Sequence, residues 1–390
     1  MRILYICMHN PFGTIGGGNL ASHAYLNAFS RLSNGLIDLI CSDELKEERN
    51  HIESSLKIGK VFFVPKRFFF EKLLSVFSGR LNRYTAFSKQ ILKCQENRYN
   101  YIVFDHNCIA GPLVDYAKKR KIKTITIHHN YEYEYYKDNT KGIWRFLFLH
   151  HVLNNEKKAY RNSDLNLFLT EQDLKTFQKV YVNSSGNNFV LGSFEYASNF
   201  FLPQIAQNKH KDFITLSITG SLCNFQTKDG IYYFFDKLYS CISSDCKIII
   251  SGRNPSDDVV RLCNSCANVE LIRNPENMNE IIQQSDIYIC PTKIGGGLKL
   301  RVMDGLRNGI PVLCHEKAAR GFDFFYGLSF FKIYHDEKEF ALYLNELVEN
   351  VKNKNFSKNF IQKKYIECFS FESGLFRLRS IFEKTFSTMI

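Results

Sequence analysis

Residues 286–306 read DIYICPTKIGGGLKLRVMDGL, and this stretch decides the fold. Its first part, DIYIC, is a short apolar run that suits a buried strand. Three glycines at 295–297 follow, and an amphipathic stretch begins near Leu298. A strand that leads through a glycine turn into a helix is the repeating unit of a parallel α/β sheet. We therefore predict one such unit here.

Short apolar runs alternate with longer amphipathic stretches along the rest of the chain. Strand, helix and strand repeated in this way predict parallel sheets covered by helices on both faces. The predicted strands are 2–7, 36–41, 61–64, 101–105, 123–128, 165–169, 188–191, 213–220, 247–252, 269–272, 286–290 and 310–314.

The length of 390 residues predicts two domains, since it exceeds what one ordinary core holds. The alternation weakens across the polar segment 203–212, which we interpret as a linker. We expect an α/β protein of two Rossmann-like halves, an N-terminal domain at 1–205 and a C-terminal domain at 206–370. Residues 371–390 are expected to form a terminal helix that packs back on the N-terminal domain, with Ser370 or Ser373 as its N-cap.

The composition favours a folded protein with an anionic partner. Hydrophobic residues make up 45% of the chain, and the formal charge of +12 attracts polyanions in general. The opening apolar run is too short for a signal peptide, and no stretch approaches the ~20 apolar residues that span a bilayer. We expect a cytoplasmic protein whose twelve cysteines are reduced. Cys263 and Cys266 form one C-x-x-C pair without a second pair at zinc-ligand spacing.

Two glycine triplets carry the clearest chemical signal. Gly16, Gly17 and Gly18 precede the first predicted helix, and the second triplet is followed by Lys299 and Arg301. Glycines at a strand-to-helix turn let backbone N–H groups approach a phosphate, and the helix dipole favours the anion. We therefore predict a diphosphate site at Gly295, Gly296, Gly297, Lys299 and Arg301, with both cations in the first turn of the helix, on its surface, and no metal ion.

Two other classes of protein remain open on these residues. Gly16, Gly18 and Ala21 satisfy G-x-G-x-x-A, and Asp43 follows at the distance of a ribose-binding acid, as in an NAD(P)-dependent oxidoreductase. However, eight residues separate Cys7 from Gly16, whereas that fingerprint follows its strand at once.

The segment 57–98 raises the second alternative. It carries a net charge of about +8 interleaved with aromatic residues such as Phe68–Phe70. Such a segment suits an anionic membrane surface or a lipid-linked substrate, a solvated charged face, or a single nucleic-acid strand. No nucleic-acid module is recognised, so we expect no nucleic-acid partner.

The chain resembles the retaining GT-B glycosyltransferases of family 4, the glycosyl transferases group 1, and in particular a bacterial branch. The run GGGLKLRVMDGL resembles the family's G-G-G-T-R-L-K-I-L-E-A, and HHNYEYEYY resembles its H-N-V-E segment. Further resemblance lies in ITGSLCNFQTKDGIYYF, ISGRNPSDDV, NPENMNEIIQQSDIYICP, GGGNLASHAYLNAFSRL and EKKAYRNSDLNLFLTEQDL. The resemblance covers nearly the whole chain in order and spacing.

This resemblance implies a two-domain GT-B enzyme with the domains facing a central crevice. It would transfer a sugar, with retention and without a metal or other cofactor, from a nucleotide-sugar to a glycan, lipid-linked or protein acceptor. His129 would lie near the transferred sugar as the catalytic candidate, with His128 as the alternative if the register slips by one. The nucleotide and ribose would be bound by Gly220, Ser221, Arg253, Arg273 and Asp304, and the donor phosphates by Gly16–Gly18, Gly295–Gly297, Lys299 and Arg301.

The sequence departs from the family's pattern in three places. Gly296 stands where many relatives carry a first glutamate, and Asp304 replaces the second. The first C-terminal loop, Gly220-Ser221, lacks the usual basic pair, and Lys228 is the only cation near it in the sequence. We therefore expect the phosphate charge to rest mainly on Lys299 and Arg301.

Overall fold

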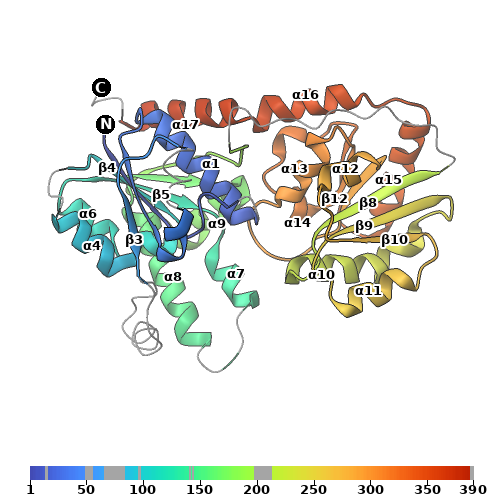
Figure 1. Ribbon diagram of the computed structural model, residues 1–390, viewed down its shortest axis with the longest axis horizontal. Coiled ribbons are helices and arrows are strands. Elements are labelled where there is room, and N and C mark those ends of the chain that lie inside the picture. Colours follow the sequence, from blue (N-terminus) through green and yellow to red (C-terminus); the bar gives the residue numbers. More distant parts are fainter. Residues whose placement is uncertain are drawn as a thin grey trace. The chain divides into compact units, whose positions relative to one another are not determined.

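The computed structural model describes residues 1–13, 16–48, 56–65, 84–94, 98–139, 142, 145–196 and 213–386. The chain divides into two compact units (Figure 1). The N-terminal unit comprises Met1–Phe200 together with Phe369–Ile390, and the C-terminal unit comprises Phe201–Cys368. The segment 203–212, which we interpreted as a linker, lies outside the described residues.

The N-terminal unit is built on a parallel sheet in the order β3-β2-β1-β4-β5-β6-β7. Its buried strands are almost uninterrupted apolar runs, as expected where helices cover both faces. The strands are β1 (Ile3–Cys7), β2 (Ile37–Ser42), β3 (Val61–Val64), β4 (Tyr101–Asp105), β5 (Lys123–His128), β6 (Leu165–Phe168) and β7 (Asn187–Val190).

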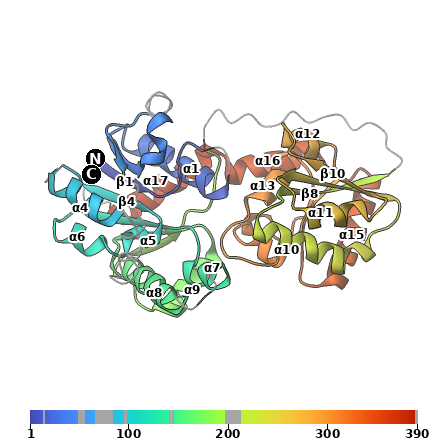
Figure 2. The same ribbon diagram turned by 60° about the horizontal axis from the view of Figure 1, so that its bottom comes forward.

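Helices from distant parts of the chain cover the two faces of this sheet (Figures 1 and 2). Because side chains alternate along a strand, Ile3 and Tyr5 face one core while Leu4 and Ile6 face the other. The first core is closed by α1 (Gly17–Leu32) and α17 (Phe371–Phe386), and the second by α4 (Tyr84–Cys94), α5 (Asn107–Ala110), α6 (Val114–Lys118) and α8 (Arg145–Asn162). In the chain, α7 (Glu132–Asn139) follows β5, and α9 (Glu171–Tyr181) follows β6.

The C-terminal unit repeats this plan in the order β10-β9-β8-β11-β12-β13, again with parallel neighbours. The core on one face is closed by α10 (Phe225–Tyr233), α11 (Asp257–Asn264) and α15 (Glu337–Lys352). The strands are β8 (Ile214–Ser221), β9 (Cys246–Arg253), β10 (Val269–Arg273), β11 (Ile287–Cys290), β12 (Val312–His315) and β13 (Phe331–Tyr334).

Another helix, α13 (Leu300–Arg307), covers the opposite face of the C-terminal sheet. Its Gly305 lies directly on Tyr288 and Val312, where an added Cβ would come within 3.0 Å of both side chains. The glycine therefore lets α13 approach the sheet closely. Two shorter helices, α12 (Met278–Gln283) and α14 (Glu316–Ala319), and the long α16 (Lys358–Phe369) complete the unit.

The expected α/β architecture with two parallel sheets is confirmed, and all twelve predicted strands are found within two residues of their predicted ends. Sequence reasoning missed β13, whose run FKIY is short and has no flanking glycine or proline. The prediction of Ser370 as N-cap is confirmed, because its Oγ accepts a hydrogen bond from the Ser373 backbone N–H at 3.2 Å.

Each sheet reverses its strand order once, between β1 and β4 and between β8 and β11. In open parallel sheets, ligands bind at the carboxyl ends of the strands beside such a reversal. We therefore expect the functional residues at the carboxyl ends of the strands beside these two reversals.

Candidate active site

At the carboxyl end of β8, the guanidinium of Arg301 lies over Gly220. Arg301 Nη1 donates to the carbonyl oxygen of Thr219 at 2.5 Å. A Cβ at Gly220 would overlap this guanidinium, so a larger residue there would displace it. The end of β8 carries no cation of its own. Arg301 of α13, which follows β11 on the other side of the strand reversal, supplies a cation there.

The side chain of Lys299 stabilises the loop of the second glycine triplet through hydrogen bonds to its carbonyl groups. Its Nζ donates to the carbonyl oxygens of Gly296 at 2.7 Å and Gly295 at 3.2 Å, and the residue is 8% exposed. Gly295 and Gly297 have φ angles of 81° and 69°, in the left-handed region that glycine adopts without strain. Lys299 is the N-cap residue of α13 rather than part of its first turn. The expectation of two cations on the helix surface is therefore wrong for Lys299, because loop carbonyls hold its ammonium inside.

The remaining predicted residues of this unit lie at the same sheet edge in different environments. Ser221 pairs in register with Arg253, and Gly252 with Arg273, which places both arginines at the ends of outer strands with exposed side chains. Lys228, by contrast, forms an ion pair with Asp258 of α11 at 3.1 Å.

Asp304, the candidate ribose ligand, is half-buried on α13 and forms an ion pair with Arg307. Burial raises the pKa of Asp304 above its usual value, against the opposing effect of Arg307 and Arg301. Binding of a ribose hydroxyl by Asp304 would therefore compete with Arg307 for the carboxylate.

In the N-terminal unit, the adjacent histidines at the end of β5 face opposite sides of the sheet. His128 stacks on Phe168 with ring centroids 4.6 Å apart, and its Nε2 lies 2.9 Å from Asn166 Oδ1. His129 instead places its Nε2 2.5 Å from Asp105 Oδ1, at the end of β4. His128 thus belongs to an aromatic core, and His129 to a polar cluster at the strand reversal.

Three histidines form the centre of this polar cluster, one from the end of each of β1, β4 and β5. The ring centroids of His106 and His129 are 5.5 Å apart and stacked, and His9 lies 5.7 Å from each. Two carboxylates complete it, because Glu132 Oε1 lies 3.1 Å from His106 Nε2 and Asp105 binds His129.

Burial and these pairings set the charges in the cluster. Burial alone would raise the pKa of Asp105, but the charge and hydrogen bond of His129 hold it well below its usual value. For Glu132, the nearby His106 likewise outweighs burial and lowers the pKa. Burial, together with the unfavourable electrostatic interaction with the neighbouring imidazoles of His129 and His106, lowers the pKa of His9 to about 4. At neutral pH the two carboxylates are therefore ionised and His9 is neutral.

The first glycine triplet adjoins this cluster. Gly16 caps α1 with a φ of 91° and is exposed, as is Gly17. A Cβ on Gly18 would lie 2.8 Å from the His9 ring, so the absence of a side chain lets the helix start close to the histidines. The structure therefore brings Gly16–Gly18 and His129 to the same strand reversal.

Sequence reasoning missed His9, Asp105, His106 and Glu132 as neighbours of His129. A signal was present, because His9, Asp105 and His106 each stand at or just after the end of a predicted strand. The carboxyl ends of parallel strands meet at one edge, so polar residues in these positions are expected to converge.

Neither a metal-binding cluster nor a membrane-spanning helix occurs among the described residues. In the ranges given above, no group of three or more His, Cys, Asp or Glu residues is arranged to hold a metal ion. None of the helices described has the length and apolar character needed to cross a membrane.

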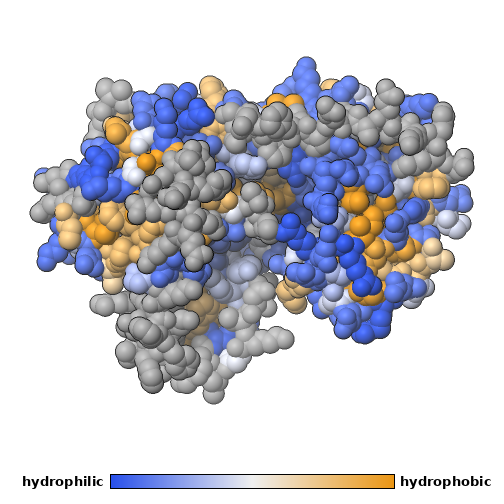
Figure 3. Space-filling model, in the orientation of Figure 1, coloured by the Kyte–Doolittle hydropathy of each residue, from blue (hydrophilic) through white to orange (hydrophobic). Residues whose placement is uncertain are grey.

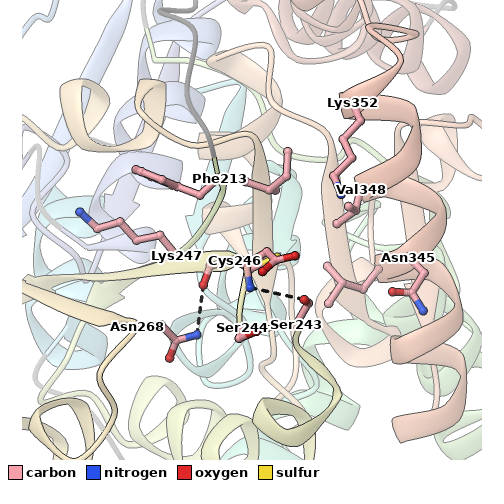
Figure 4. Close-up of a pocket in the computed structure, with 12 residues that line it drawn as sticks. Phe213, Ser243, Ser244, Cys246, Lys247, Asn268, Asn345, Val348 and Lys352 are labelled. Carbon is pink, nitrogen blue, oxygen red and sulfur yellow. Dashed lines mark hydrogen bonds between the residues drawn. The ribbon is translucent and has the colours of Figure 1, made fainter.

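A pocket of about 440 Å³ lies at the opposite, amino-terminal edge of the C-terminal sheet (Figure 4). It is formed by residues that precede or begin β8, β9 and β10, among them Phe213, Lys247 and Asn268, and by α15. None of the predicted site residues lines it. On the face drawn in Figure 3, hydrophilic residues predominate among the described ones, and an apolar patch is visible on each unit.

Comparisons with known proteins agree with this architecture. Sucrose-phosphate synthase from Thermosynechococcus elongatus superposes with a TM-score of 0.74 at 11% identity, covering 99% of each chain. The lipopolysaccharide outer core galactosyltransferase WaaB gives 0.68 at 13% identity, and Anabaena HepE in complex with UDP gives 0.68 at 11%, each covering 100% of both chains. The search of curated proteins gave no match.

Two Rossmann-like units with these strand orders define the GT-B class of glycosyltransferase folds. The family model described as glycosyl transferases group 1 matches residues 214–350, which lie within the C-terminal unit. That region matches the family's model, and the chain as a whole has the GT-B fold of these glycosyltransferases.

Proposed function

We propose that the chain transfers a sugar from a nucleotide-sugar bound by the C-terminal unit to a glycan, lipid-linked or protein acceptor, with retention and without a metal ion. The observation that carries this proposal is the guanidinium of Arg301, held over Gly220 at the strand reversal beside the Gly295–Gly297 loop. This edge offers a fixed cation and a glycine-rich backbone, which is the chemistry that a diphosphate requires.

The charge that develops during transfer explains why a cation belongs there. Cleavage of the bond between the sugar and the phosphate leaves a nucleoside diphosphate with new negative charge. A preorganised cation at that position stabilises the transition state more than the ground state. Arg301 is preorganised because Thr219 fixes its orientation, and Lys299 contributes by holding the loop carbonyls away from the anion.

For the acceptor side, the proposal assigns the catalytic position to His129. Asp105 accepts a hydrogen bond from His129 Nε2, which leaves Nδ1 as the ring atom for a substrate hydroxyl. The buried carboxylate also stabilises a positive charge on the imidazole. His129 would thereby orient an acceptor or sugar hydroxyl and accept its proton.

The test is a thermal-shift panel of UDP-, GDP-, ADP- and dTDP-sugars, followed by a transfer assay with the sugar that binds. UDP-sugars come first, because HepE was solved with UDP-glucose. Arg301→Ala should weaken binding of the nucleotide-sugar at least about tenfold, the loss of one charge-assisted contact.

Lys228→Ala is the matched control, since Lys228 is a cation of the same unit that binds Asp258 instead. It should leave affinity unchanged. Equal affinity of wild type and Arg301→Ala, or no stabilisation by any nucleotide-sugar, would contradict the proposal.

A cytoplasmic location at an anionic membrane surface belongs to the same proposal. It is supported by the formal charge of +12 and the basic, aromatic composition of 57–98, although Phe68–Phe70 lie outside the described residues. Flotation should recover the protein with anionic but not neutral vesicles, and less of it as salt screens the attraction. Recovery with both vesicle types, or with neither, would count against it.

A further inference from the structure

Glu156 is a buried carboxyl in the middle of α8 that the proposed reaction does not use. It is 1% exposed, and four donors from three other parts of the N-terminal unit converge on it. Its Oε1 accepts from the Glu132 backbone N–H at 2.7 Å and from Asn107 Nδ2 at 2.8 Å. Its Oε2 accepts from the Tyr181 hydroxyl at 2.9 Å and from the Tyr133 backbone N–H at 3.1 Å.

Two of these donors are the first amides of α7. The first N–H groups of a helix have no partner within it and need an acceptor from outside. Glu156 supplies this acceptor for both amides from α8, a helix that lies later in the chain. An apolar residue at 156 would leave these amides and the buried Asn107 side chain without this acceptor, which destabilises the start of α7.

Fixing the start of α7 fixes the side chain of Glu132. Its carboxylate lies 3.1 Å from His106 Nε2 and 3.2 Å from Asn130 Nδ2. The His106 ring in turn stacks on that of His129 with an interplanar angle of 19°. A displacement of the α7 start would therefore move Glu132. It would then move the His106 ring and, through the stacking contact, the His129 ring.

We propose that Glu156 is a positioning residue for His129, which it holds in place through the start of α7, Glu132 and His106. The inference rests on the proposed function for its activity readout. A second readout, the titration of His106, does not depend on any activity.

The protonation of Glu156 suits this role. Burial, reinforced by the negative charge of Glu132, raises the pKa of Glu156 to about 8. A neutral carboxyl avoids repulsion from Glu132 while it keeps oxygen acceptors for the amides. Glutamine is neutral and keeps one acceptor oxygen, whereas alanine keeps none, so glutamine should preserve the contacts in part and alanine should lose all of them.

The experiment compares Glu156→Ala with Glu156→Gln in the full chain. Glu156→Ala should lower kcat about ten- to hundredfold, as for a displaced catalytic geometry, with unchanged affinity for the nucleotide-sugar. Glu156→Gln should retain more activity than Glu156→Ala, because it keeps one of the two acceptor oxygens. Histidine NMR should show a lowered pKa of His106 in the alanine variant, because Glu132 no longer stabilises its charge.

Asn166→Ala is the matched control. Asn166 is also buried and also makes four hydrogen bonds in this unit, to His128, Tyr160, Ser184 and Asn188. It should lower the melting temperature comparably while kcat and the pKa of His106 remain unchanged. If Glu156→Ala behaves like this control, Glu156 supports the fold alone and the inference is overturned.

Two further outcomes are distinguishable. If Glu156→Ala does not fold, Tyr181→Phe removes a single donor and should lower kcat at least about twofold. Wild-type kcat in Tyr181→Phe together with an unmoved His106 would then overturn the inference. If wild-type protein transfers no sugar, the proposed function fails, and the His106 titration alone decides on Glu156.

Discussion

His128 and His129 are adjacent in the sequence, yet they serve different parts of the N-terminal unit. The alternation of side chains along β5 turns one ring into an aromatic core beside Phe168 and Phe177, and the other toward Asp105. Burial lowers the pKa of His128 to about 3, so this histidine stays neutral within its core. The difference between the two rings is a matter of surroundings and not of residue type.

Replacing these histidines one at a time should separate catalysis from stability. We expect His129→Ala to lower kcat by about 10²-fold or more, the contribution of a positioned proton-transfer group, with nucleotide binding unchanged. His128→Ala should instead lower the free energy of unfolding by about 2 kcal/mol, because it leaves a cavity beside Phe168. A loss of kcat confined to His128→Ala would transfer the catalytic assignment to that residue.

The raised pKa of Glu156 can be tested through the pH dependence of the unfolding free energy. A carboxyl whose pKa is raised to about 8 in the folded chain stabilises fully below its unfolded pKa of about 4.5. This stabilisation is lost as the pH rises through about 8. The unfolding free energy of wild type should therefore fall from pH 5 to 9 relative to that of Glu156→Gln, as urea denaturation would measure. A constant difference between the two across this range would contradict the raised pKa.

At the scale of elements, the strand–loop–helix unit β11–α13 was recognised from sequence, but its internal contacts were not. Glycine spacing shows where the backbone turns sharply, and therefore where a phosphate can approach. It does not show that Lys299 would fold back on the carbonyls of Gly295 and Gly296, or that Arg301 would reach Thr219. Rotamers of long side chains depend on neighbours that local sequence does not specify.

The Lys299 contacts predict a structural defect in this loop. Lys299→Met keeps the length of the side chain but removes two hydrogen bonds from a charged donor, worth about 2 kcal/mol or more. It should lower the melting temperature and weaken nucleotide-sugar binding together. Lys293→Met is the control in the same loop, because Lys293 is exposed and lies over the Tyr233 ring. A Lys299→Met variant with weakened binding and an unchanged melting temperature would show that the ammonium contacts the donor directly.

At the scale of the whole molecule, the sequence predicted two parallel sheets because both halves show the same alternation of strands and helices. The polar cluster of the N-terminal unit was not predicted beyond His129, because it combines residues from the ends of three strands. Their convergence follows from the order β1-β4-β5, which the sequence does not state. Similarly, Glu156 lies in the middle of a helix, where nothing local distinguishes it from a surface glutamate.

Catalysis by the proposed arrangement should be independent of metal ions. In the proposed arrangement, Arg301 supplies the positive charge that a divalent cation supplies in metal-dependent enzymes with phosphate-containing substrates. Transfer should therefore continue in excess EDTA at nearly the same rate. A loss of activity that Mg²⁺ or Mn²⁺ restores would show that these side chains are insufficient.

The helix α17 follows the C-terminal unit in the chain but completes the core of the N-terminal unit. Phe371, Leu378, Phe382 and Phe386 pack there with α1 and the sheet. At the usual pace of synthesis, roughly 10–40 s separate the emergence of β7 from that of α17. During that interval on the ribosome, the apolar face prepared for α17 is open to chaperones and to other nascent chains. The half of the enzyme that is translated first is thus the half that matures last.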